Sequence, residues 1–315
     1  MDAASIRRKL IRWYRRAKRD LPWRRTRDPY AIWISEIMLQ QTRVAAVIPY
    51  YERFLQRFPD AASLAAADEE ELLALWSGLG YYSRARNLRK AARDIASRGA
   101  FPKEHSDLLT LAGIGEYTAA AVASIAFGRP HAAVDGNVRR VIARLTNDAD
   151  ADAAEIADRL LDRKDPGGWN QAMMELGATI CVPRKPLCDA CPLSANCAAR
   201  IAGTARDLPQ KKNKPDVVRV ERTLLVIRRG RKILLTPSPR VHGFWDLPGP
   251  FPGPRSGAEL GSFTHTITNK RYRFRVKEAR SSKTPAGARW FSLDQLEEIP
   301  LGTTARKALK IYNAR

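Results

Sequence analysis

The chain has 315 residues, of which 44% are hydrophobic, and its 55 Lys and Arg against 33 Asp and Glu leave a net charge of +22. This length suggests about two domains that each bury a core, and the lack of any run of about 18 apolar residues argues against a membrane helix. The basic N-terminal segment has no apolar stretch, so we expect no secretory signal. The excess of positive charge favours a polyanionic partner, and nucleic acid is the first expectation.

Residues 1 to about 200 have the pattern of a helical domain. Apolar residues recur at helical spacing from Ile6 to Ala17, with Arg and Lys between them. A second helix is predicted from Ala31 to about Pro49, and Gly and Pro residues separate the helices that follow. Further helices are expected at YYERFLQRF, DEEELLALW, SRARNLRKAARDIA, SDLLTL, EYTAAAVASIAF, GNVRRVIARL, AEIADRLLD and WNQAMMELGATI.

The second of these helices contains one acidic residue among apolar ones. Glu36 has large side chains one turn away, namely Ile32, Trp33, Leu39 and Gln40. A carboxyl group in such surroundings resists ionisation and can act as a general acid near neutral pH. The pattern alone leaves open that Glu36 is a surface residue on the polar edge of the helix.

The segment from Leu109 to Gly128 contains an L-x-G-I-G turn between two helices. Gly113 and Gly115 are expected to let the backbone bend tightly and turn its N–H groups toward a phosphate at the start of the next helix. Such a turn is most often a plain helix connection. After it, Asp135 occupies the N-cap position of GNVRRVIARL. It is either only a helix cap, or a carboxylate that backbone N–H groups keep ionised to stabilise a positive charge.

The two carboxylates therefore have opposite expected environments. Glu36 would stay neutral and deliver a proton, while Asp135 would stay charged. This combination fits cleavage of a glycosidic bond through an oxocarbenium-like transition state.

All four cysteines of the chain lie within 17 residues, with the spacing C-x6-C-x2-C-x5-C. Such a compact group argues for a metal site rather than for disulfides. Zinc is the alternative, but four-thiolate zinc sites usually have two separated C-x2-C pairs. A single loop after a helix favours a [4Fe–4S] cluster. The predicted ligands are Cys181, Cys188, Cys191 and Cys197.

The sequence changes character after residue 201. Residues 202–217 are polar, Lys-rich and contain proline, so they are predicted to form a linker. Residues 218–315 follow with two expected hairpins, RTLLVIRRGRKILLTP and TITNKRYRFRVKEA, then one strand and a C-terminal helix. The predicted fold class is an all-α domain over residues 1–201, with the cysteine loop at 181–197, followed by a small α+β domain.

Several motifs occur together in one order: LPWR, PYAIWISEIMLQQTRVAAVIPYYERF, WSGLGYYSRARNL, the glycine hairpin, VDGNVRRV, NQAMMELGATIC and the cysteine loop. In this order they closely resemble the MutY adenine DNA glycosylases of the helix-hairpin-helix superfamily. The resemblance covers nearly all of residues 5–200. It implies a base excision repair enzyme that holds a [4Fe–4S] cluster on the four cysteines.

The resemblance also implies a role for each matching residue. Glu36 would protonate adenine at N7 and later handle the water, and Asp135 would stabilise the sugar cation. The other implied residues are Tyr117 and Asn137 in the pocket, Arg24 and Gln171 at the base or its water, and Gln41 and Tyr81 as wedges in the duplex.

Tyr117 distinguishes between related enzymes. The similar endonuclease III enzymes have a lysine here, whose amine attacks the sugar, and a phenol cannot do so. The chain is therefore expected to be monofunctional. Thymine–uracil mismatch glycosylases also have a tyrosine at this point, but they typically lack a domain corresponding to residues 218–315, which favours MutY.

The C-terminal segment resembles, more weakly, the NUDIX-like domain of MutY that recognises 8-oxoguanine. Phe263, Thr264 and His265 stand where the family usually has Phe-Ser-His. Residues 250–262 are too few for the helical insert expected there, so the domain is shortened. The chain lacks the R-E-x2-E-E signature, so pyrophosphate hydrolysis is not expected.

The leading hypothesis is a glycosylase that removes adenine mispaired with 8-oxoguanine or guanine in double-stranded DNA. The protein is expected to be a monomer that does not bind a membrane. If the source is bacterial, it is expected in the cytoplasm, associated with the nucleoid. One alternative is a thymine/uracil mismatch glycosylase. The other is a non-catalytic iron–sulfur DNA-binding protein, against which the presence of both Glu36 and Asp135 argues.

Overall fold

The computed structural model describes residues 2–209, 216–267 and 269–314, without the side chain of Ser256. The contacts divide the chain into a helical unit, Met1–Ala66 with Asn87–Lys212, and a second unit, Ala67–Arg86 with Asn213–Arg315. The sequence predicted one boundary, a linker at residues 202–217, of which 210–215 lie outside the described residues. No described helix is long and apolar enough to cross a membrane.

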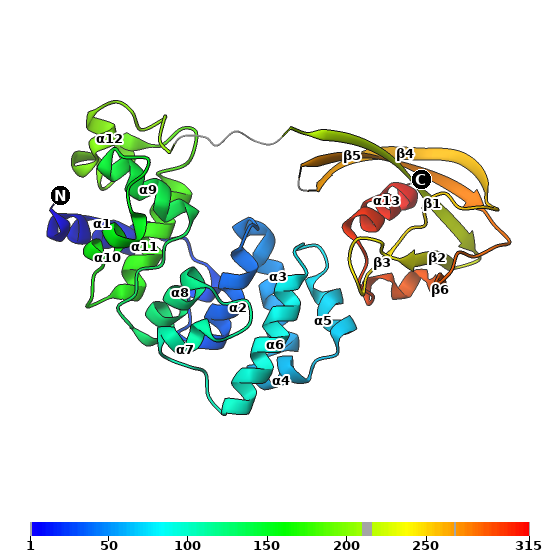
Figure 1. Ribbon diagram of the computed structural model, residues 1–315, viewed down its shortest axis with the longest axis horizontal. Helices are drawn as coiled ribbons and strands as arrows, with labels where there is room; N and C mark the ends of the chain where they lie inside the picture. Colours follow the sequence, from blue (N-terminus) through cyan, green and yellow to red (C-terminus); the bar gives the residue numbers. More distant parts are fainter. Residues whose placement is uncertain (1, 210–215, 268, 315) are drawn as a thin grey trace. The chain divides into compact units, whose positions relative to one another are not determined.

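The helical unit is a set of short helices joined by tight turns (Figure 1). One of its cores joins the N-terminal helix to helices of the C-terminal half and is built around Leu10, Ile142 and Trp169, which are almost fully buried. The elements are α1 (Ala3–Ala17), η1 (Pro22–Arg24), α2 (Pro29–Leu39), α3 (Val44–Arg57), α4 (Ala61–Ala66), the larger part of α6 (Ser83–Arg98), α7 (His105–Leu109), α8 (Glu116–Phe127), α9 (Gly136–Thr146), α10 (Ala153–Leu160), α11 (Pro166–Thr179), η2 (Cys188–Ala190), η3 (Ser194–Asn196) and α12 (Ala198–Ile201).

The predicted helix from Ala31 to about Pro49 is wrong as a single element. The chain leaves α2 after Leu39, takes a left-handed turn at Gln41 with φ of 57°, and starts α3 at Val44. Pro49 lies in the second turn of α3 and does not end the helix. The break lies directly beyond the turn that carries Glu36.

The glycine turn between α7 and α8 has the expected shape. Gly113 has φ of 79°, and a Cβ there would lie 2.7 Å from the Cβ of Asn87, so only glycine fits. Gly115 is the N-cap of α8 with φ of −102° and open space around its Cα. The conformational freedom of glycine is therefore used at Gly113 and not at Gly115.

The second unit contains a mixed sheet with strand order β3-β2-β1-β5-β4, and β6 pairs with β2. β1 and β5 run parallel, and the other pairs are antiparallel. Helix α13 packs on one face over Val226, Phe274 and Val276 (Figure 1). Both predicted hairpins, the later strand and the C-terminal helix are confirmed. The elements are β1 (Val218–Arg229), β2 (Lys232–Pro237), β3 (Trp245–Asp246), β4 (Arg255–Ile267), β5 (Lys270–Arg280), β6 (Arg289–Ser292), η4 (Leu293–Glu297) and α13 (Thr303–Asn313).

Helix α5 (Glu69–Trp76) and the turn after it pack against this sheet domain. The Ser77 hydroxyl donates to the carbonyl of Leu301 at 2.7 Å and accepts from Arg306 at 3.0 Å. The rings of Tyr82 and Phe244 lie 3.9 Å apart between centroids. These contacts explain why residues 67–86 group with the second unit, which the sequence pattern did not predict.

Candidate active site

A cavity of about 500 Å³ lies in the helical unit, between η1, α2, α8, α11 and the start of α9. The residues that line it come from segments more than 100 positions apart in the sequence. Seven predicted site residues are among them: Arg24, Glu36, Gln41, Tyr117, Asp135, Asn137 and Gln171.

Glu36 lies in the wall of this cavity and not on a polar edge. The residue is 5% exposed, and the Tyr117 hydroxyl donates to Glu36 Oε2 at 2.6 Å. Burial raises the pKa of Glu36 to about 7, against the opposing effects of the Tyr117 hydrogen bond and of Arg24, and the charge of Asp135 adds to the increase. The carboxyl can therefore carry a proton near neutral pH, which suits a group that gives a proton and later takes one.

Tyr117 is fixed as a hydrogen-bond donor. Burial, followed by the charge of Glu36, raises the pKa of the phenol well above its usual value. The hydroxyl also lies 3.6 Å from the sulfur of Met174. A phenol that keeps its proton can orient Glu36 but cannot act as a nucleophile.

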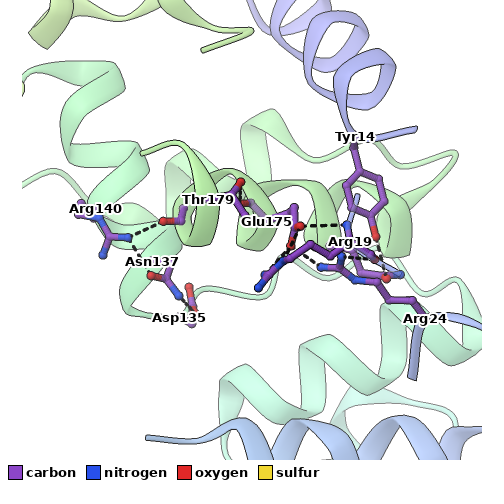
Figure 2. Close-up of polar contacts among 10 residues, drawn as sticks. Tyr14, Arg19, Arg24, Asp135, Asn137, Arg140, Glu175 and Thr179 are labelled. Atoms are coloured by element: carbon purple, nitrogen blue, oxygen red, sulfur yellow. Dashed lines mark hydrogen bonds and ion pairs between the residues drawn. The ribbon is translucent and has the colours of Figure 1, made fainter. Parts of the chain in front are cut away.

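Asp135 caps α9, and its two oxygens have separate partners. Oδ1 accepts from the backbone N–H of Val138 at 2.7 Å, and Oδ2 accepts from the Asn137 amide at 2.8 Å. Arg140 in turn donates to Asn137 Oδ1 at 2.8 Å (Figure 2). It also donates to the carbonyl of Cys181 at 2.8 Å. The Asp135 carboxylate is thus held in one orientation by a cap and by a supported amide, so the two explanations considered for this residue are compatible.

An arginine–glutamate cluster, which the sequence patterns did not predict, forms another part of the wall. Glu175 is completely buried, and Arg19 and Arg24 both bind it at 2.8 Å (Figure 2). Burial raises the pKa of Glu175, but the hydrogen bonds from the two arginines outweigh this and lower it to about 2. Next to the cluster, the Tyr14 hydroxyl donates to Gln171 Oε1 at 3.0 Å. A signal existed in the sequence, because Glu175 is an acid on an apolar helix one turn after Gln171.

The four cysteines surround a second, small cavity at the end of α11. Arg144 is buried beside it and donates to the sulfur of Cys181 at 3.3 Å and to the carbonyls of Val182 and Pro183. Within the described ranges, no three Cys, His, Asp or Glu side chains converge closely enough to hold one metal ion.

Comparison with known proteins identifies the family. The model of the HhH-GPD superfamily of base excision DNA repair proteins matches residues 34–166. The adenine DNA glycosylase of Homo sapiens is 32% identical over an alignment of 410 residues that covers all of this chain and 75% of that protein. The chain belongs to the adenine DNA glycosylase family.

Two further proteins resemble this adenine DNA glycosylase over about two thirds of its length. The adenine DNA glycosylase of Rattus norvegicus is 46% identical over 217 residues, which is 63% of this chain and 42% of that protein. A solved thermostable thymine-DNA glycosylase is similar with a TM-score of 0.59 and 31% identity, over 64% of this chain and 97% of that chain. The helical fold expected from the sequence is confirmed.

The cysteine loop of this adenine DNA glycosylase family member suits a multi-iron cluster by its donor chemistry. All four donors are soft sulfur ligands, which hold iron–sulfur clusters and also zinc. In a cluster each thiolate binds a different iron, so the sulfurs need to surround a cavity and not to meet at one point. Cys181, Cys188, Cys191 and Cys197 all line the same cavity.

The remaining predicted residues are not among those that line the main cavity. Tyr81 is 59% exposed and has φ of 48°, a left-handed conformation that costs about 1 kcal/mol or more for a residue other than glycine. On β4, Thr264 is exposed opposite Arg273, whereas Phe263 stacks on Phe274 at 5.2 Å in the core. His265 lies 3.4 Å from Lys307, and burial followed by that charge lowers its pKa.

Proposed function

We propose that this adenine DNA glycosylase hydrolyses the N-glycosidic bond of adenine mispaired with 8-oxoguanine or guanine in double-stranded DNA, and that it leaves an abasic site without cutting the strand. The observation that carries this proposal is the pair of carboxylates in one cavity. Glu36 is buried with a pKa of about 7, while Asp135 accepts two hydrogen bonds. An acid that can be neutral and a carboxylate held by donors are the two groups that glycosidic cleavage requires.

In the proposed mechanism Glu36 protonates N7 of an adenine that has left the base stack, which makes the base a better leaving group. The donated hydrogen bond from Tyr117 keeps the carboxyl aimed into the cavity. As the glycosidic bond lengthens, positive charge develops on the sugar, and the fixed charge of Asp135 stabilises it. Glu36, now ionised, accepts a proton from the water that attacks.

The absence of an amine nucleophile supports a monofunctional reaction. Tyr117 occupies the position where the similar endonuclease III enzymes have a lysine, and no lysine is among the described residues that line the cavity. Without an amine, no Schiff base to the sugar can form. The product is then an abasic site whose strand breaks only in alkali or heat.

Four groups of residues are assigned contacts with DNA. The backbone N–H groups after the Gly113–Gly115 turn would bind a phosphate at the start of α8. Gln41 and Tyr81, both in left-handed turns, would enter the duplex at the mispair. Arg24 and Gln171 would contact the base, and the exposed hydroxyl of Thr264 would contact the 8-oxoguanine.

We assign a [4Fe–4S] cluster to the four cysteines. When bound, it would cross-link the loop after α11 covalently. Arg140 donates to the carbonyl of Cys181 and to Asn137, so the position of the loop bears on the support of Asp135. No step of the proposed reaction involves the cluster.

One assay tests the proposal against its closest alternative. The similarity to a solved thymine-DNA glycosylase makes a thymine/uracil mismatch activity the second candidate. Base release is measured under single-turnover conditions on 8-oxoguanine:A, G:A, G:T and G:U duplexes. The proposal predicts release from the first two only, with no covalent adduct trapped by borohydride. Release from G:T or G:U alone, or an efficiently trapped adduct, contradicts it.

A further inference from the structure

The arginine–glutamate cluster of Arg19, Arg24 and Glu175 joins three segments of the chain at the wall of the main cavity. Glu175 lies on α11, Arg24 on η1 and Arg19 in the turn between α1 and η1. The Glu175 side chain is 0% exposed, and that of Arg24 is 11% exposed. All three residues line the cavity. The buried Glu175 carboxylate therefore fixes the positions of the Arg19 and Arg24 guanidinium groups beside the site proposed for the adenine base.

The hydrogen bonds of Glu175 leave it little freedom. Oε1 accepts from the backbone N–H of Arg19 at 3.1 Å and from its Nε at 2.8 Å. Oε2 accepts from one terminal nitrogen of Arg19 and one of Arg24, each at 2.8 Å. A carboxylate has about four acceptor sites, so this one is fully used inside the protein. Glu175 therefore binds no substrate atom itself and acts only through the arginines.

Arg24 retains donors for a ligand. Of its five N–H groups, the hydrogen bonds of the described residues occupy one on Glu175 and one on the carbonyl of Arg19, at 3.1 Å. Its guanidinium also lies 5.5 Å from the centre of the Tyr14 ring, which restricts the plane of the group. The guanidinium is thus held on three sides, and its other N–H groups are available to the ring nitrogens of a base.

Charge balance gives Glu175 a second effect. Two guanidinium groups beside the cavity would repel a protonated base and a sugar cation, both of which the proposed reaction forms. One buried carboxylate removes half of that charge, and at low effective dielectric its effect is larger than in water. Glu175 thus orients the arginines and also lowers the positive potential in the cavity, which suits a reaction that forms cations there.

We propose that Glu175 is a positioning residue of the base pocket: it fixes Arg24 for contact with the target base and reduces the positive charge that the transition state must meet. This inference rests on the proposed adenine excision and adds to it a residue outside the two reacting carboxylates. It predicts an effect on the rate of base release that exceeds any effect on the binding of duplex DNA.

The test uses Glu175→Gln in the full chain, with Glu155→Gln as the matched control. Glu155 is exposed on α10 and pairs loosely with Arg159 at 3.8 Å. Single-turnover release of adenine from an 8-oxoguanine:A duplex is measured per active enzyme, together with the dissociation constant for a non-cleavable duplex. Glu175→Gln should slow release about 10- to 100-fold, the range for a lost charge-assisted hydrogen bond, with little change in duplex binding. Glu155→Gln should behave as the wild type.

The pH profile separates positioning from a merely structural role. The charged and titratable groups that face Glu36 are Tyr117 from α8, Asp135 from the start of α9 and Arg24 from η1. Without Glu175, the uncompensated arginines favour the ionised form of Glu36, so the alkaline fall in rate should move to lower pH. Glu175→Asp keeps the charge and should restore the wild-type midpoint while the rate stays reduced.

A double variant keeps the inference testable if Glu175→Gln folds poorly. Arg24→Lys leaves the Arg19–Glu175 pair in place and should slow release to a similar extent. If Glu175 acts through Arg24, Arg24→Lys combined with Glu175→Asp should be no more than about threefold slower than the slower single variant. Multiplicative losses, or a Glu175→Gln enzyme whose active fraction falls while its rate and pH midpoint stay normal, would overturn the inference. A wild type that releases no adenine would instead refute the proposed function.

Discussion

Removal of one hydroxyl tests how Glu36 obtains its ionisation behaviour. Tyr117→Phe deletes the 2.6 Å hydrogen bond to Glu36 Oε2 and keeps the ring. This bond favours the ionised carboxylate, and its loss should raise the pKa of Glu36 above its present value of about 7. A buried hydrogen bond to a charged group contributes about 1.5–3 kcal/mol, which corresponds to about 1–2 pH units in a midpoint.

The sign of the effect on rate follows from the form of Glu36 that is active. The protonated carboxyl gives its proton to the base, so the rate falls as pH rises through the pKa of Glu36. In Tyr117→Phe this fall should move to higher pH, even though the loss of orientation lowers the maximum rate. Asp135→Asn should move the fall to lower pH, because the charge of Asp135 raises the pKa of Glu36.

Single-turnover release of adenine between pH 5 and pH 10 measures both midpoints. Opposite displacements in the two variants are the expected result. An unchanged alkaline midpoint in Tyr117→Phe would refute the argument that this hydroxyl tunes the carboxyl. A displacement to lower pH would mean that this hydrogen bond favours the protonated and not the ionised form of Glu36.

Three further predictions concern stability, the cysteine loop and the lesion. The folded protein holds the pKa of Glu36 above its unfolded value. The stabilising effect of the protonated carboxyl is therefore complete below about pH 4.5 and is lost as pH rises through about 7. In denaturant titrations, Glu36→Gln should be as stable as the wild type at pH 4 and more stable than it at pH 8, by up to about 3 kcal/mol. Cys191→Ser should lose iron and sulfide in elemental analysis and bind duplex DNA more weakly, whereas stoichiometric zinc in the anaerobically purified wild type would contradict the cluster. Thr264→Val keeps the shape of an exposed side chain and should reduce the preference for 8-oxoguanine over guanine by about fivefold, the effect of one hydrogen bond, in paired excision assays; an unchanged preference would exclude Thr264 as the reader.

Local patterns predicted most elements because the causes of those elements are local. The alternation of β5 and the cap at Asp135 depend on neighbours within a few positions, and both were predicted. The break between α2 and α3 was not, because no Gly or Pro marks the left-handed turn at Gln41.

The cavity shows the same distinction between local and long-range causes. Glu36 was recognised because its own helix surrounds it with apolar groups. Glu175 is also an acid on an apolar helix, but its arginine partners lie more than 150 positions away, so the sequence did not indicate the cluster. The grouping of residues 67–86 with the sheet domain has the same origin, because it depends on contacts such as Ser77 with Leu301.

The central claim is that Glu36 supplies the proton for adenine release in the cavity it shares with Asp135. Glu36→Gln has the same shape but no proton to give, so its single-turnover release of adenine from an 8-oxoguanine:A duplex measures this claim directly. We expect release to fall by at least about 100-fold, the usual contribution of general acid catalysis, while the duplex is bound as tightly as by the wild type. Release at the wild-type rate would contradict the account.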